Sequence, residues 1–348
     1  MIEITGTAQR QAWHDDVLPP VEAVRDGLWS IPVPIPNNPL RYVLVYALAL
    51  PDGVAIVDSG WNTDESWAAL CAGLRTAGYD ITDVRAVLIT HIHPDHFGLA
   101  GRVREASGAW VGIHEADASL LPARYGPGMD DLVTQMRDLL ADCGVPDDEL
   151  GVMSSASLGV RELVTLAEPD RYIDDGEKLD LPGWDLHAIW TPGHSPGHLC
   201  FAEPSRRLVL TGDHVLPRIT PNVSMHTQST TSPLADFMES LAKVRGCASD
   251  EVLPAHEWRF AGLAERVDDL LTHHRRRLDE IAAVVAASPG LTCWEATTRL
   301  SWSRPWDDIQ GFMRRAANGE TLAHLIVLQT QGRIRSTGQR PQRWELVG

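Results

Sequence analysis

Long apolar runs are absent from this sequence. No stretch approaches the roughly 20 consecutive apolar residues that a membrane-spanning helix needs. Glu3, Arg10 and His14 interrupt the N-terminal segment, so it lacks the apolar core of a secretory signal. We therefore expect no membrane partner, and a cytoplasmic location as the default.

Cysteine is scarce as well. The 348 residues contain five, an odd number, and no two of them form a Cys-x-x-Cys pair. Such scattered thiols make neither a disulfide framework nor a thiolate metal site, so buried free thiols are the simpler expectation. The five are Cys71, Cys143, Cys200, Cys247 and Cys293.

Positive charge is in short supply over most of the chain. The formal net charge of -17 disfavours a protein that binds polyanions over its whole surface. From His273 to the end, however, 11 Arg and no Lys stand against 7 acidic residues, while the first 272 residues carry 19 basic and 40 acidic ones. This asymmetry fits either a C-terminal region that contacts nucleic acid or a basic region docked on an acidic one. Both interpretations stay open.

Apart from these scarcities, the chain has a globular composition. With 44% hydrophobic residues, it is long enough for one large domain and a small one. Strand-like runs at 27–33, 42–50 and 54–57 predict an antiparallel meander, after which strands alternate with helices. The segment 122–170 breaks this alternation and contains a helical pattern near 129–143. We expect it to be an insertion that serves as a lid or substrate wall.

Metal-capable side chains are concentrated directly after the apolar run 84–89. Four of them fall within six residues, namely His91, His93, Asp95 and His96. Because they are two residues apart in extended backbone, His91 and His93 point to the same side of the chain. Pro94 favours extended backbone at His93 and suits the position just before a helix, which places Asp95 at the expected N-cap. We expect the first two histidines to face one metal ion, and Asp95 and His96 to face a second.

Three more ligand candidates follow strand-like runs later in the chain. His194 lies in a Thr-Pro-Gly-His loop framed by glycine and proline, Asp213 in Thr-Gly-Asp, and His256 in Pro-Ala-His. Ligands at successive strand ends converge on one edge of a sheet, so these three are expected beside the 91–96 motif. His198 is expected to support its loop through hydrogen bonds rather than to bind metal.

The sequence beyond residue 258 has a different pattern. A long helix is predicted at 262–287, followed by helical segments at 292–300, 307–317 and 320–330 and by short strands at 333–336 and 343–346. Three helices and a terminal strand pair are typical of a winged-helix module. We therefore divide the chain into a catalytic domain at 1–258 and a C-terminal domain at 259–348.

The ordered motifs around His91, His194, Asp213 and His256 resemble those of the metallo-β-lactamase superfamily. The resemblance covers roughly residues 20–258, and Asp58, which ends a strand before Ser-Gly, matches an acidic residue that precedes the motifs. It implies an α/β (α+β) fold, the αββα sandwich of two packed sheets with helices outside, and a binuclear metal site at one edge. The C-terminal part is similar to the winged-helix extension found on one branch of that superfamily.

Carried over residue by residue, the resemblance implies a complete ligand set. The first metal ion would be held by His91, His93 and His194, the second by Asp95, His96 and His256, with Asp213 as the bridge. Asp58 would fix a ligand or a water without touching metal. Asp stands at 213 where one group of β-lactamases has Cys, and His stands at 93 where flavodiiron proteins have Glu. The pattern is therefore more similar to glyoxalase II-type thioesterases, lactonases, and hydrolases and nucleases that bear a winged helix.

Two divalent metal ions are the expected cofactors, with Zn²⁺ first and Fe²⁺ or Mn²⁺ compatible with the same ligands. They would bring a bridging water to a near-neutral pKa, and Asp95 would act catalytically by orienting this hydroxide and shuttling its proton. The first hypothesis is a hydrolase of a small-molecule thioester, lactone or related ester. The alternative is a nuclease that grips RNA or DNA with the winged helix, and a third is a metal-dependent interaction scaffold without turnover. The sequence also allows a homodimer.

Overall fold

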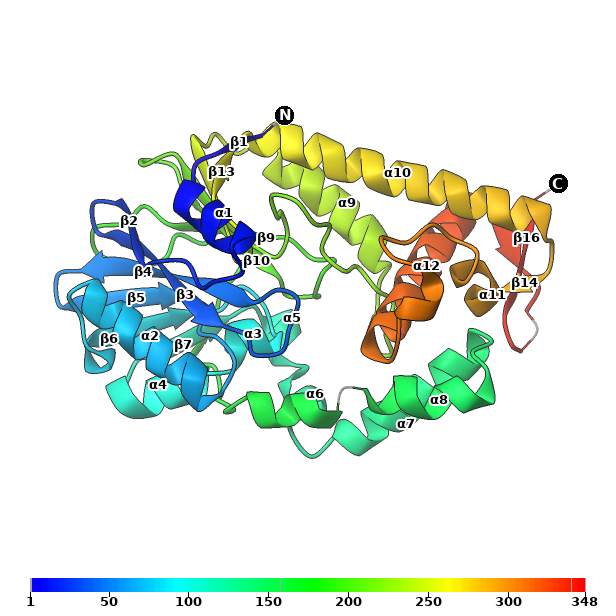
Figure 1. Cartoon of the computed structure of the whole chain (residues 1–348), viewed down its shortest axis with the longest axis horizontal. Helices are drawn as coiled ribbons and strands as arrows, with labels where there is room; N and C mark the ends of the chain where they lie inside the picture. The colour runs from blue at the N-terminus through cyan, green and yellow to red at the C-terminus, as the bar shows by residue number, and fades with distance from the viewer. Residues whose placement is uncertain (1, 157, 339, 348) are drawn as a thin grey trace. The chain divides into compact units, whose positions relative to one another are not determined.

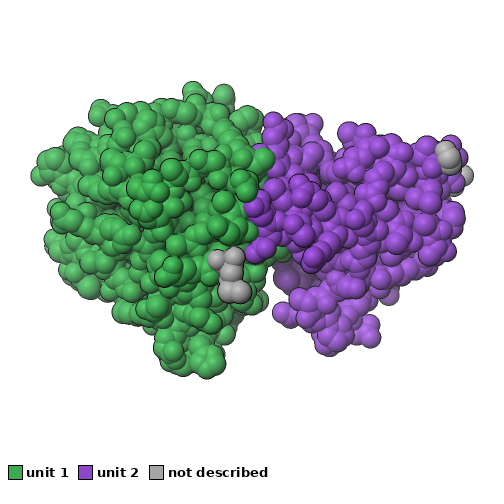
Figure 2. All heavy atoms as spheres, turned by 90° about the horizontal axis from the view of Figure 1, so that it is seen from above, with its two compact units in different colours: residues 1–121, 160–221, 240–267 green, residues 122–159, 222–239, 268–348 purple. Residues whose placement is uncertain are grey.

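The computed structural model describes residues 2–156, 158–338 and 340–347 (Figure 1). Contacts within the chain divide it into two compact units, coloured separately in Figure 2. Unit 1 comprises Met1–Leu121, Val160–Pro221 and Ser240–Val267, and unit 2 comprises Pro122–Gly159, Asn222–Glu239 and Asp268–Gly348. The predicted division at residue 258 differs from this grouping, because it assigned 122–159 to the catalytic domain whereas these residues group with the C-terminal region.

The larger sheet of unit 1 has the strand order β2-β3-β4-β5-β6-β7-β8. An antiparallel meander is formed by β2 (Glu22–Arg25), β3 (Leu28–Pro34), β4 (Tyr42–Leu50) and β5 (Gly53–Val57). This confirms the meander predicted from the sequence. Parallel pairing then continues through β6 (Val84–Leu88), β7 (Trp110–Ile113) and β8 (Arg171–Tyr172). The carboxyl ends of these parallel strands therefore share one edge of the sheet.

The smaller sheet of unit 1 has the order β1-β13-β12-β11-β10-β9. Its strands are β1 (Glu3–Ile4), β9 (His187–Trp190), β10 (Leu199–Glu203), β11 (Leu208–Gly212), β12 (Glu251–Pro254) and β13 (Phe260–Ala261). β11 and β12 pair in parallel, whereas the other neighbours are antiparallel. Both sheets are therefore mixed.

The hydrophobic core fills the space between the two sheets. Leu44, Tyr46 and Leu48 of β4 are buried in one cluster with Phe201 of β10 and Leu253 of β12. Alternate residues of a strand face the same side, which is why the three β4 side chains share the inner face of their sheet. Burial of such large apolar side chains is the main force that holds the two layers together.

Helices cover the outer faces of the sheets. α2 (Asp64–Thr76) and α4 (Ala100–Ser107) lie along the larger sheet (Figure 1). Gly73 permits this approach, because a Cβ there would lie 2.2 Å from Ile31 Cγ2 of β3. At the smaller sheet, Ser240 Oγ of α9 (Pro233–Val244) donates a hydrogen bond of 2.9 Å to Pro192 O. Unit 1 is thus the αββα sandwich that the family resemblance implies.

Unit 2 combines the 122–159 segment with a small C-terminal region of helices and strands. Its elements include α7 (Met129–Asp142), α8 (Asp147–Ser155), α11 (Cys293–Thr297), α12 (Phe312–Thr330) and a sheet of β14 (Leu291–Thr292), β16 (Arg343–Leu346) and β15 (Ile334–Ser336). Trp294 N donates to Cys143 O over 2.9 Å, which ties α7 to α11. α1 (Thr7–His14) belongs to unit 1, whereas α6 (Leu121–Tyr125) and α10 (Leu263–Ala287) run from unit 1 into unit 2.

The predicted helices at 307–317 and 320–330 are wrong in their boundaries. The structure has a short 3-10 helix at Trp306–Asp308 and then one continuous helix, α12. Gly319 does not break this helix. It allows the chain at 224–225 to pack closely, because a Cβ would lie 2.9 Å from Ser224 Cβ and 3.0 Å from Met225 O. The winged-helix identity of the C-terminal region and the lid role of the insertion stay predictions.

The structure bears on two predictions about scarce features. Among the described residues, no helix is both long and apolar enough to cross a bilayer. All five cysteines are free thiols, and each is buried except Cys247, which is partly exposed. This confirms free thiols over disulfides.

Candidate metal centre

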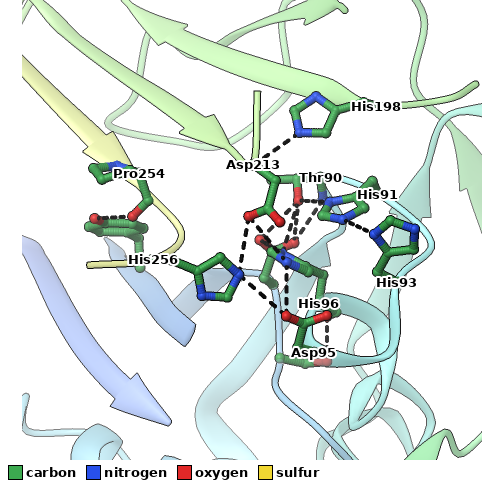
Figure 3. A network of polar contacts seen from close by, with 12 residues as sticks. Thr90, His91, His93, Asp95, His96, His198, Asp213, Pro254 and His256 are labelled. Atoms are coloured by element: carbon green, nitrogen blue, oxygen red, sulfur yellow. Dashed lines mark hydrogen bonds and ion pairs between the residues drawn. The ribbon is translucent and has the colours of Figure 1, made fainter. Parts of the chain in front are cut away.

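The predicted ligands follow strand ends in both sheets. His91, His93, Asp95 and His96 come after β6, His194 after β9, Asp213 after β11 and His256 after β12. The structure brings all seven side chains together in unit 1, as the close view in Figure 3 shows for the labelled residues. Strand ends far apart in the sequence thus meet because the two sheets pack face to face.

The backbone of the 91–96 motif explains how its side chains diverge. His93 is extended, with φ -62° and ψ 151°, and is the N-cap of the short helix α3 (Pro94–Phe97). The sequence predicted Asp95 as the N-cap, which is wrong by two residues. Pro94 occupies the first helical position. Its fixed φ suits a helix, and its missing N–H costs no hydrogen bond because that position has no intrahelical acceptor. The turn from strand to helix therefore falls between His93 and Asp95, and the two residues face different groups.

Donor atoms gather in three groups, within each of which all lie within 4.8 Å of one another. The groups are His91, His93 and His194; Asp95, His96 and His256; and His91, His96 and Asp213. The first two coincide with the two ligand sets implied by the family resemblance. The third group contains one histidine from each of the other two groups, together with Asp213. The carboxylate of Asp213 therefore lies between the first two groups.

The carboxylate of Asp213 faces both histidine groups. Its Oδ1 is 3.2 Å from His256 Nε2 and 3.5 Å from His96 Nε2, and its Oδ2 is 3.5 Å from His194 Nε2. One oxygen thus points to each group. This is the arrangement expected of a bridging ligand.

The spacing of the donors fits metal coordination. Two ligand atoms, each about 2.0–2.1 Å from a tetrahedral zinc ion, lie about 3.3 Å apart. Asp95 Oδ2 is 3.3 Å from His256 Nε2 and 3.6 Å from His96 Nε2. His96 Nε2, His256 Nε2 and Asp213 Oδ1 are buried and make no hydrogen bond within the described residues. Because buried polar atoms are almost always satisfied, a cation is the partner that this donor set fits.

The protonation of the cluster follows from its charges. Burial opposes a charge on His256, but Asp213 and Asp95 outweigh it and raise the pKa of His256 from 6.5 to about 10. The carboxylates Asp95, Asp58 and Asp213 likewise raise the pKa of His96 well above its usual range against the effect of burial. His91 behaves in the opposite way, because burial and the neighbouring histidines hold its pKa well below 6.5. Metal binding would therefore displace protons from His96 and His256.

The outer nitrogens of the buried histidines are held by protein oxygens. His96 Nδ1 lies 2.8 Å from Asp58 Oδ2, and His256 Nδ1 lies 2.8 Å from the carbonyl oxygen of Tyr42. His91 Nδ1 lies 3.0 Å from Thr90 Oγ1. Each contact orients a ring and leaves Nε2 directed at the cluster. Asp58 thus lies behind the candidate ligand His96, which is the position that the sequence resemblance implies.

His198 supports the site through hydrogen bonds, as predicted. Its Nε2 accepts from Asp213 N over 3.2 Å, and its Nδ1 lies 2.8 Å from Thr191 Oγ1. Since Nε2 accepts, the ring proton is on Nδ1 and points to the threonine. The ring thereby fixes the backbone that presents the Asp213 carboxylate.

Sequence reasoning missed Asp117 and Thr90. Asp117 is fully buried in α5 (Glu115–Ala118) and accepts hydrogen bonds from both loops that carry the first histidine group. Thr90 N donates to Asp58 Oδ1 over 2.8 Å. The available signal was position, since Thr90 follows β6 and Asp117 lies in the short helix after β7, both beyond the ligand-bearing edge of the larger sheet.

Comparison with known proteins agrees with the fold. The family model described as "Metallo-beta-lactamase superfamily" matches residues 38–256. The chain therefore belongs to the metallo-beta-lactamase superfamily. A metallo-beta-lactamase family protein from Thermus thermophilus has a similar structure, with a TM-score of 0.79 at 30% identity over 93% of this chain and 100% of that one. A beta-lactamase domain protein from Burkholderia ambifaria has a TM-score of 0.80 at 24% identity over 99% and 98% of the two chains.

Curated relatives carry hydrolase names. "Probable metallo-hydrolase YqjP" of Bacillus subtilis is 25% identical over 84% of this chain and 90% of its own length. "Atrochrysone carboxyl ACP thioesterase" of Aspergillus fumigatus is 26% identical over 65% of this chain and 40% of its own length. With its His/Asp clusters forming a candidate binuclear site, this chain is a metallo-hydrolase. An enzyme is thereby favoured over the interaction scaffold.

Proposed function

We propose that this enzyme hydrolyses a small-molecule thioester, lactone or related ester with the help of two divalent metal ions. The proposal rests chiefly on Asp213, whose two oxygens face two separate histidine groups. Zn²⁺ is the first choice for five imidazoles and two carboxylates, and Fe²⁺ or Mn²⁺ also suit these ligands. Bound at this site, the ions would supply a water nucleophile of near-neutral pKa and polarise the scissile carbonyl.

Asp95 is the residue we assign to proton transfer. Its carboxylate contacts His96 and His256 and is 13% exposed, whereas those two rings are fully buried. Burial raises the pKa of Asp95, but the His96 and His256 charges outweigh burial and lower it below 3.8. The group is therefore ionised at neutral pH and can orient the attacking water and accept its proton.

Nucleophilic side chains near the site are poorly suited to attack. Burial raises the pKa of the Cys200 thiol to about 12, so the reactive thiolate does not form at neutral pH. The Ser195 hydroxyl donates to Asp117 over 2.7 Å and lies in a fully buried position. Attack by water is therefore favoured over a covalent acyl-enzyme.

A small acyl substrate suits the charge distribution better than nucleic acid does. The net charge of -17 repels polyanions. The excess of arginine in the C-terminal region was the reason for the nuclease alternative. Within unit 2, six of these arginines have an acidic partner, namely Arg277, Arg314, Arg333, Arg335, Arg340 and Arg343. The thioesterase name of the Aspergillus fumigatus relative also supports an acyl substrate.

The test combines metal analysis with a substrate panel. Purified protein is expected to contain two divalent ions per chain and to turn over members of a panel of thioesters and lactones, with β-lactams and short oligonucleotides as comparison. Asp95→Ala should abolish hydrolysis, whereas Asp26→Asn, which changes an exposed carboxylate of unit 1, should not. Hydrolysis that persists unchanged in Asp95→Ala would refute the role of Asp95. Metal binding without turnover of any ester would refute the substrate class.

A further inference from the structure

A single carboxylate connects the two loops that carry the first histidine group. Asp117 Oδ2 accepts hydrogen bonds from Ile92 N over 2.8 Å and from Ser195 Oγ over 2.7 Å. Its Oδ1 accepts from Gly197 N over 2.6 Å. Ile92 stands between His91 and His93, and Ser195 directly follows His194. Asp117 is thus hydrogen-bonded to residues next to all three candidate metal ligands of the first group, although it lies on neither loop.

The surroundings of Asp117 favour an ionised carboxylate. The side chain is fully buried, and each contact given above brings a hydrogen-bond donor to it. A carboxylate accepts on both oxygens, whereas an asparagine would turn an NH₂ group toward one of these donors. Hydrogen bonds to a charged acceptor are also shorter and stronger than those between neutral groups. The contacts therefore hold the two loops at a fixed separation.

The sequence of the second loop is adapted to this contact. A Cβ at residue 197 would lie 2.5 Å from Asp117 N and 2.7 Å from Asp117 Cβ, so only glycine lets the loop backbone come this close. α5 itself has an independent anchor, because the His114 ring stacks on Trp190 with 5.0 Å between centroids and 4° between planes. The helix therefore does not depend on Asp117 alone for its place.

The second group is held by other residues. Asp58 contacts His96 Nδ1, and the Tyr42 carbonyl contacts His256 Nδ1, each at 2.8 Å. Neither contact involves α5. Loss of the Asp117 carboxylate should therefore disturb the two groups unequally.

We propose that Asp117 is a positioning residue that sets the separation of the His91–His93 segment from His194, and so controls the affinity of one of the two metal ions. This inference rests on the binuclear site of the proposed function. It predicts that the two ions can be separated energetically. Without the Asp117 carboxylate, the His91, His93 and His194 group binds metal more weakly, while the Asp95, His96 and His256 group keeps its affinity.

The experiment is a titration of metal-free protein with Co²⁺, followed by visible absorption, together with Zn²⁺ analysis after dialysis. Asp117→Asn should weaken one of the two binding steps about 10- to 100-fold, a typical loss for a residue that orients ligands, and leave the other near its original value. Ser195→Ala removes one contact and keeps the carboxylate, so it should weaken the same step by less. Asp26→Asn is the control and should titrate as the original protein does.

Several outcomes overturn the proposal. Asp117→Asn that binds both ions as tightly as the original protein would refute it, as would an equal loss at both steps. If Asp117→Asn does not fold, Ser195→Ala decides, and equal weakening of both steps or of neither sinks the inference. If the original protein itself binds fewer than two ions, the binuclear site of the proposed function fails and the inference falls with it. The two failures are therefore distinguishable.

Discussion

Asp58 Oδ2 lies 2.8 Å from His96 Nδ1, and both side chains are almost completely buried. The contact engages Nδ1 of His96, whose proton is directed at the carboxylate, so Nε2 is the nitrogen left to bind a metal ion. Nε2 therefore faces Asp95 and Asp213. Asp58 can hold this position because its backbone has φ +64°, a left-handed conformation that Asp tolerates better than most residues.

Replacing Asp58 should weaken the second metal group. In Asp58→Ala, His96 loses its orienting partner, and Thr90 N loses the acceptor that it binds at 2.8 Å. We expect metal affinity to fall about 10- to 100-fold, and the unpaired amide to cost about 1–3 kcal/mol of unfolding free energy. Metal analysis after dialysis and chemical denaturation measure the two effects. Unaltered metal content would contradict the role given to Asp58.

Removing the Asp213 carboxylate should affect both ions at once. Asp213→Ala deletes the two oxygens that face His194 on one side and His96 and His256 on the other. We expect hydrolysis to be lost and metal content to fall below one ion per chain, because neither group keeps its shared ligand. The same preparation serves for substrate turnover and elemental analysis. Retention of two ions would show that Asp213 does not bridge.

Part of this site could be predicted from sequence because its chemistry is local. His91, His93 and His96 stand in one short motif, and His194, Asp213 and His256 each follow a strand beside a small or cyclic residue. A strand end fixes where a ligand side chain leaves its sheet, and the packing of the two sheets then brings these side chains together. Strand-like apolar runs predicted the antiparallel meander, whereas the αββα architecture was implied by the resemblance of the ordered motifs to the metallo-β-lactamase superfamily.

Other features depend on tertiary packing and left no local signal. Asp117 is one acidic residue in a chain with 47, and only the fold shows that two distant loops donate to it. Gly319 looks like a helix breaker, whereas the structure uses it for close packing inside α12. The segment 122–159 groups with the C-terminal region through contacts between residues more than 100 positions apart, such as Cys143 and Trp294.

Metal binding should release protons and become tighter as pH rises. Asp213 and Asp95 hold the pKa of His256 at about 10, above its ordinary 6.5, despite burial. Metal must displace this proton, so affinity at the second group should increase with pH between about 6.5 and 10. Calorimetric Zn²⁺ titration in buffers of different ionisation enthalpy counts the protons released. A count of zero near neutral pH would contradict this assignment.

The same proton should stabilise the metal-free fold. Because the pKa of His256 is raised in the folded protein, its protonation adds to the free energy of unfolding. This stabilisation is complete below about pH 6.5 and is lost as pH rises through about 10. The opposite holds for Asp213, whose pKa is depressed by His256 and His96 in spite of burial. Its contribution is present above about 3.8 and is lost as pH falls below that value. The melting temperature of the metal-free protein should therefore fall as pH rises toward 10. In Asp213→Ala this fall should be smaller.

Oligonucleotide binding separates the proposed esterase from the nuclease alternative. A protein that contacts several phosphates loses affinity steeply with salt, with a slope of about 0.7–0.9 per phosphate on a log–log scale. Here Arg333 pairs with Asp279 and Arg335 with Glu345, at 2.8 Å and 2.7 Å, so their charges are already partly compensated. We expect no measurable binding of short RNA or DNA by fluorescence anisotropy, even at low salt. Tight binding that weakens with salt, and is lost when Arg333 and Arg335 are replaced by Gln, would instead establish a nucleic-acid partner.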